Sequence, residues 1–142
     1  MNYAEIKTFD VANGPGIRLS LFVSGCTHRC PGCFNEKAWD FSYGKPFTLA
    51  TIDYIIDTLK FGAYKGVTFL GGEPLEPSNQ KGLLPLAKRL KEVYPDKTIW
   101  CFTGYEFERD IMGRMYNTIP ETKEFLSYIC LLYTSDAADD RI

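Results

Sequence analysis

The sequence lacks the features that mark membrane, secreted or nucleic-acid-binding proteins. Its 142 residues contain no run near the roughly 20 consecutive apolar residues that a spanning helix needs, and the N-terminus lacks the charged and then apolar pattern of a secretion signal. Lysine and arginine number 16 against 18 aspartate and glutamate, so the net charge of −2 gives no long-range attraction to nucleic acid or anionic lipid. We therefore expect a cytoplasmic protein that binds neither nucleic acid nor membrane.

Hydrophobic residues, in contrast, are abundant enough for a folded core. They make up 45% of the chain against 24% charged residues, which is unlike the composition of a disordered protein. The length of 142 residues fits one domain, since domains usually contain roughly 100 to 150 residues. We expect a single domain.

Strand and helix patterns alternate along the chain. In IRLSLFV, apolar residues alternate with polar Arg18 and Ser20, which predicts the first strand. Apolar residues then recur at helical spacing after Thr48, a residue type that caps helices. The predicted strands are residues 17–23, 66–70, 98–103 and 128–132; the predicted helices are residues 48–60, two segments with apolar faces at Leu83, Ala87, Leu90, Val93 or Tyr94 and at Phe107, Ile111, Met115, and residues 120–127.

This alternation predicts an α/β fold with parallel strands joined by right-handed crossovers. At about 30 residues per unit the chain has room for three to four βα units, fewer than the eight of a closed barrel, so we expect an open, partial βα barrel. Residues 13–16 (Asn-Gly-Pro-Gly) predict a turn, because the Gly-Lys-Ser/Thr ending of a phosphate-binding loop is missing. Functional groups of such folds gather beyond the carboxyl ends of the strands, where three distinctive loops should meet.

The first of these loops contains a cysteine cluster. The chain has five cysteines, an odd number, and Cys26, Cys30 and Cys33 form a CxxxCxxC motif that suits metal binding better than a disulfide framework. Three thiolates so close in sequence can hold one face of an iron-sulfur cluster. No fourth ligand follows nearby, so a four-iron cluster would keep one iron open to a small molecule.

A zinc site is the alternative. His28 or the distant Cys101 or Cys130 would then complete a tetrahedral set, although structural zinc sites usually pair two short ligand motifs. We expect His28 to be a solvated or substrate-facing loop residue, and Cys101, inside an apolar strand, to be a small buried hydrophobic residue.

Four motifs in combination indicate a family. CxxxCxxC after the first strand and Gly-Gly-Glu-Pro after the second resemble the radical S-adenosylmethionine (SAM) enzymes. More narrowly, NGPGIR, FVSGCTHRCPGCFN, LGGEPL and IWCFTGY resemble the activating proteins of anaerobic ribonucleoside-triphosphate reductases, over roughly residues 3–130. The form of NGPGIR is shared with the related activase of pyruvate formate-lyase.

The resemblance implies a set of site residues. A [4Fe-4S] cluster would be held by the three cysteines of the motif, and SAM would chelate the open iron. Gly72 would let the backbone approach the methionine part of SAM, and Glu73 could accept from its ammonium group. The implied residues are Cys26, Cys30 and Cys33 for the metal, and Gly32, Cys33, Phe34, Gly72 and Glu73 for the cofactor, with Gly32 and Phe34 beside the adenine.

The chain departs from the family pattern beside the last cysteine of the motif. Many family members have an aromatic residue just before the last cysteine, where this chain has Gly32; Phe34 follows that cysteine instead. Thr103 and Tyr105 should lie in the cleft, with no role assigned.

The resemblance also implies a function. The protein would accept an electron from a low-potential donor, cleave SAM to a 5′-deoxyadenosyl radical, and generate a glycyl radical on the catalytic subunit of the anaerobic ribonucleotide reductase. Two alternatives stay open: an activase of another glycyl-radical enzyme such as pyruvate formate-lyase, and a non-catalytic zinc-binding module.

The C-terminal segment departs from the family. Residues 131–142 show no resemblance to it, so we expect a domain over residues 1–130, a truncated family C-terminus, and a disordered or artefactual tail.

Overall fold

A single mixed sheet organises the fold. The computed structural model describes residues 1–27 and 39–135, and within them six strands form one sheet in the order β3-β1-β2-β4-β5-β6. The strands are β1 (Asn2–Asp10), β2 (Ile17–Val23), β3 (Lys45–Pro46), β4 (Tyr64–Gly71), β5 (Thr98–Phe102) and β6 (Leu131–Tyr133). β2, β4, β5 and β6 are parallel, whereas β1 pairs antiparallel with both β2 and β3.

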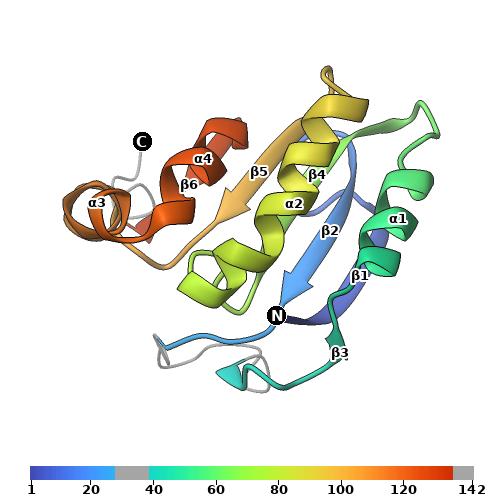
Figure 1. Ribbon diagram of the computed structural model, residues 1–142. Coiled ribbons are helices and arrows are strands. Elements are labelled where there is room, and N and C mark those ends of the chain that lie inside the picture. The colour runs from blue at the N-terminus through green and yellow to red at the C-terminus, as the bar shows by residue number, and fades with distance from the viewer. Residues whose placement is uncertain (28–38, 136–142) are drawn as a thin grey trace.

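Helices connect the parallel strands. They are α1 (Leu49–Thr58), α2 (Pro77–Val93), the π-helix η2 (Phe107–Met115), α3 (Tyr116–Thr118) and α4 (Pro120–Tyr128). α1, α2 and α4 all lie on the same face of the sheet (Figure 1). In residues 1–27 and 39–135, no helix has the length and apolar character to cross a membrane. With one sheet and the helices that connect its parallel strands, the fold is mixed α/β, as predicted.

The predicted alternation of strands and helices is confirmed. β2 occupies residues 17–23 as expected, and α1 begins after Thr48, whose Oγ1 accepts a hydrogen bond from the backbone N–H of Thr51 (3.4 Å). The Thr51 hydroxyl accepts in return from the backbone N–H of Thr48 (3.2 Å), so both residues satisfy donors that a helix start leaves free. Pro120 lies in the first turn of α4, where its missing N–H costs nothing. The last strand begins at Leu131 instead of residue 128.

Two strands, β1 and β3, were not predicted from the sequence. β1 is a nine-residue strand (NYAEIKTFD) that is mostly half-buried or exposed, and its pairing with β2 is broken by register shifts on either side of the segment Glu5 to Lys7. Phe9, beside the second shift, has a φ of 55°, in the left-handed region. Strands with bulges and one solvated side carry no clean alternation of apolar residues, so periodicity does not detect them.

The segment after β5 also differs from the prediction. Regular α-helical spacing placed Phe107, Ile111 and Met115 on one buried face, but η2 is a π-helix in which the Ile111 N–H donates to the Glu106 carbonyl five residues back (3.2 Å). Ile111 and Met115 are buried, whereas Phe107 is 41% exposed. Phe107 is the first residue of η2, and at this helix end its side chain is open to solvent although its spacing matches that of Ile111 and Met115. Val93 is likewise exposed at the end of α2.

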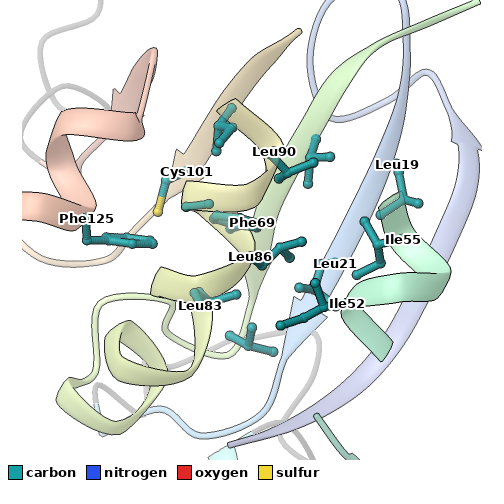
Figure 2. Packing of buried hydrophobic residues seen from close by; sticks show 14 of the residues in the cluster. Leu19, Leu21, Ile52, Ile55, Phe69, Leu83, Leu86, Leu90, Cys101 and Phe125 are labelled. Carbon is teal, nitrogen blue, oxygen red and sulfur yellow. The ribbon is translucent and has the colours of Figure 1, made fainter. Parts of the chain in front are cut away.

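The hydrophobic core lies between the sheet and the helices. Figure 2 shows side chains of β2 and β4 packed against α1 and α2, with Phe125 of α4 next to β5. The Phe69 and Phe125 rings stack with centroids 6.1 Å apart. Each fully buried Leu, Ile or Phe contributes roughly 1.5 to 3 kcal/mol of transfer free energy. This core fixes the strand ends that present the site.

The opposite face of β2 is also buried, because Arg18 pairs there with neighbouring strands. Arg18 is completely buried, and its guanidinium donates to the Thr68 and Thr98 hydroxyls (2.8 and 2.9 Å) and to the Val67 and Thr98 carbonyls (both 2.9 Å). Its charge also lies 5.3 Å from the ring centre of Trp100. Arg18 therefore ties β2 to β4 and β5, and a polar residue in an alternating strand is not necessarily exposed.

Candidate functional site: the carboxyl edge of the sheet

Three loops meet beyond the carboxyl ends of the parallel strands. We call them the β2 loop (residues 24–27 of the described chain), the β4 loop (72–76) and the β5 loop (103–106). The arrowheads of β2 and β5 point to the same edge in Figure 1. The Gly72 N–H donates to the Val23 carbonyl (2.8 Å), and the Glu73 N–H donates to the Gly25 carbonyl (2.7 Å). The predicted meeting of these loops is therefore confirmed for the described residues.

Glycines allow the close approach of the first two loops. Gly25 has a φ of 104° and Gly71 a φ of 108°, a region that residues with a Cβ rarely adopt. A Cβ on Gly71 would lie 2.7 Å from the backbone nitrogen of Val23, which is rigid sheet backbone. Gly71, the first glycine of Gly-Gly-Glu-Pro, is therefore required by the structure, since no residue with a Cβ fits against β2 at this position.

Glu73 joins all three loops. Its side chain is 1% exposed, and its carboxylate accepts hydrogen bonds from the Thr103 hydroxyl (2.6 Å), the Gly104 N–H (2.8 Å) and the Leu75 N–H (2.9 Å). Charge-assisted hydrogen bonds of this length are the strong ones in proteins. Thr103, predicted only as a cleft residue, is therefore one of the donors that hold the Glu73 carboxylate.

Tyr105 lies in the same cleft and binds a second carboxylate. Its hydroxyl donates to Oε1 of Glu76 (2.6 Å), and burial, followed by this hydrogen bond, raises the pKa of the Tyr105 phenol well above its ordinary value. The phenol therefore stays protonated at physiological pH and keeps its role as a donor. Glu76 was not predicted as a site residue. Its position directly before Pro77 indicates a helix start, but not that its carboxylate is buried and bound to Tyr105.

The first cysteine of the motif opens on a hollow at this edge. Cys26 is half-buried, and its N–H donates to the Trp39 carbonyl (3.3 Å). A hollow of about 390 Å³ is lined by Cys26, Thr27, Trp39, Asp40, Phe41 and Ser42. A thiol beside an open space of this size suits a thiolate ligand of an iron-sulfur cluster, whose irons take cysteine sulfur. A larger hollow of about 580 Å³ lies between β1 and α1, and none of the described residues that line it is a cysteine.

The other predicted loop residues lie outside the described residues. These are His28, Cys30, Gly32, Cys33 and Phe34, so their roles as ligands and cofactor neighbours stay predictions. In residues 1–27 and 39–135, no group of three or more His, Cys, Asp or Glu side chains is placed to hold a metal ion. Two of the three predicted cysteine ligands are not in that range.

The distant cysteines are poorly placed to complete a zinc site with Cys26. Cys101 is completely buried in β5, and burial, followed by the nearby charge of Glu73, raises the pKa of its thiol well above the ordinary value. It is the small buried hydrophobic residue that the sequence predicted. Cys130 is exposed and directly precedes β6, so it lies at the amino edge of the parallel sheet, opposite Cys26.

Comparison with known proteins agrees with this site. Residues 12–135 match the model of the 4Fe-4S single cluster domain family. The chain is 44% identical over 110 residues to the anaerobic ribonucleoside-triphosphate reductase-activating protein of Escherichia coli K12. The aligned region covers 76% of this chain and 71% of that protein. The proteins of that name from Haemophilus influenzae (48% over 110 residues; 76% and 71% covered) and Enterobacteria phage T4 (42% over 108 residues; 76% and 69%) are similar as well.

The family model spans residues 12–135, which include the cysteine motif and the β4 loop, and each of the three relatives covers 76% of the chain. The chain therefore belongs to the 4Fe-4S single cluster domain family and, within it, to the family of anaerobic ribonucleoside-triphosphate reductase-activating proteins.

Proposed function

We propose that this chain is a radical SAM activase of an anaerobic ribonucleoside-triphosphate reductase. In this proposal Cys26, Cys30 and Cys33 hold a [4Fe-4S] cluster, and one iron stays open to SAM. When bound, the cluster and SAM supply an electron transfer and the cleavage of a carbon-sulfur bond that yields a 5′-deoxyadenosyl radical. The observation that supports it most is the position of Cys26, beside a hollow of about 390 Å³, where the three loops meet.

The residues of the β4 loop would orient SAM. Gly72 is held by its N–H to the Val23 carbonyl (2.8 Å), which gives the backbone a fixed position for the methionine part. The Glu73 carboxylate lies in the same loop and would attract the ammonium group, while its three bonds to the chain keep it in place. Gly32 and Phe34 would border the adenine.

The partner would be the catalytic subunit of the reductase, whose glycine would give up a hydrogen atom to the radical. We infer an open βα barrel of the radical SAM type, because α1, α2 and α4 lie on one face of the sheet and the three loops meet at its carboxyl edge, where a protein loop would enter (Figure 1). A low-potential electron donor and a cytoplasmic location belong to the same proposal. A boundary near residue 130 stays a prediction; β6 spans Leu131–Tyr133.

Mixing the reconstituted protein with candidate partners tests this function. After anaerobic reconstitution with iron and sulfide, reduction in the presence of SAM and an anaerobic ribonucleoside-triphosphate reductase should give a glycyl-radical signal in electron paramagnetic resonance (EPR). Omitting SAM should remove the signal. A signal with pyruvate formate-lyase alone would favour the other activase. A protein that takes up zinc but forms no iron-sulfur cluster would favour the zinc-binding module.

A further inference from the structure

Residues on both sides of Cys26 are held by the start of α2. On the N-terminal side, the Asn79 side-chain amide donates to the carbonyls of Ser24 (3.0 Å) and Glu73 (2.9 Å). On the C-terminal side, the Thr27 hydroxyl donates to Oε1 of Glu76 (2.9 Å). The first cysteine therefore sits in a short segment whose ends are both tied to one helix.

The Glu76 carboxylate accepts hydrogen bonds from two loops and not from its own helix. Glu76 is the N-cap residue of α2, but its side chain makes no capping hydrogen bond. It is 5% exposed, and its Oε1 accepts from Thr27 of the β2 loop and from Tyr105 of the β5 loop (2.6 Å). A carboxylate so deeply buried is costly unless donors satisfy it, so these two hydroxyls stabilise Glu76 and fix their own loops at the same time.

We propose that Glu76 and Tyr105 are positioning residues that fix the position of Cys26, as a cluster ligand, through the Thr27 hydroxyl. This inference rests on the proposed function, since it takes Cys26 as a cluster ligand. Partners beyond the ligands orient them and tune the metal, and losing such a partner typically costs 10- to 100-fold in metal affinity or activity. Glu76 holds Thr27, the residue next to the ligand, and Tyr105 holds Glu76 and also contacts the Thr27 side chain.

Two variants that remove one hydroxyl each test the proposal. Thr27→Val removes the donor to Glu76 at nearly constant volume, and Thr27→Ser restores it. Tyr105→Phe removes the second donor. Tyr128→Phe is the matched control, because the Tyr128 hydroxyl also donates to a glutamate, Glu124 (3.0 Å), but this hydrogen bond is exposed to solvent at the end of α4.

The readouts are iron release to a chelator and the EPR spectrum of the reduced cluster, both independent of turnover. Thr27→Val and Tyr105→Phe should bind the same amount of iron as the unaltered protein but release it about tenfold faster, with altered spectra. Thr27→Ser and Tyr128→Phe should behave like the unaltered protein. The double variant Thr27→Val with Tyr105→Phe should release iron more slowly than the product of the two single effects predicts, because the Thr27, Glu76 and Tyr105 side chains contact one another.

The outcomes separate the two proposals. If the unaltered protein holds an open four-iron cluster and both hydroxyl variants match it in release rate and spectrum, the positioning role is overturned and the proposed function stands. Should the unaltered protein form no such cluster, both fall. If Thr27→Val does not fold, as judged by circular dichroism, Tyr105→Phe alone decides, since it leaves the β2 loop unaltered.

Discussion

Protein with Cys26→Ala should hold no stable four-iron cluster after anaerobic reconstitution. In the proposed site, removal of one of the three thiolate ligands would leave a second iron without a protein ligand, and two cysteines would not hold the cluster against exchange with solvent. We expect the iron and sulfide content to fall to near background. Chemical analysis of iron and acid-labile sulfide, on protein handled without oxygen, measures the effect.

Cys130→Ala is the control for this experiment. Cys130 is exposed at the opposite edge of the sheet, so its loss should leave the iron and sulfide content unchanged. If Cys26→Ala kept a full cluster while Cys130→Ala lost it, the ligand set would be wrong and the distant cysteine would have to replace Cys26.

The largest effect on stability is expected at Glu73. Glu73→Ala leaves the Thr103 hydroxyl and the N–H groups of Leu75 and Gly104 without their acceptor in a buried site. Because each unsatisfied buried donor costs about 1 to 3 kcal/mol, the free energy of unfolding should fall by roughly 4 kcal/mol. Glu73→Gln keeps the shape and one acceptor oxygen, so it should lose about half as much. Urea unfolding followed by circular dichroism gives both values.

Glu92→Gln provides the comparison at an exposed glutamate of α2, where surface substitutions usually change stability by less than about 0.5 kcal/mol. Equal unfolding midpoints for Glu73→Ala and Glu92→Gln would show that the three hydrogen bonds do not hold the loops together. The same series should show weaker SAM binding for Glu73→Gln, since the neutral amide no longer attracts an ammonium group.

Much of the architecture could be predicted because buried parallel strands and amphipathic helices have strong periodicity. β2 and α1 illustrate this: an apolar run and a capped helix gave the right positions, and the topology then placed three loops at one edge. β1 could not be found in this way, because its polar residues and broken register leave no regular pattern. The π-helical turn was missed for a related reason, since a hydrogen bond to the fifth residue back leaves no mark in composition.

The sequence predicted which residues lie at the site, but not which of them form hydrogen bonds with one another. Cys26 and Gly-Gly-Glu-Pro lie at the predicted carboxyl edge, and Thr103 and Tyr105 were predicted in the cleft without roles. Their bonds to Glu73 and Glu76 join loops that are about 30 residues apart along the chain, specifically 30 and 29. Such contacts depend on tertiary structure, which a single sequence does not specify directly. The buried Arg18 is a similar case, because its partners belong to two other strands.

EPR of the reduced cluster with and without SAM tests the central claim most directly. A cluster held by three cysteines has one iron that a small molecule can reach, so SAM should change the spectrum of the reduced protein, and a SAM-free sample should keep the original one. An identical spectrum in both samples would show that SAM does not bind the cluster iron, which contradicts the proposed chemistry.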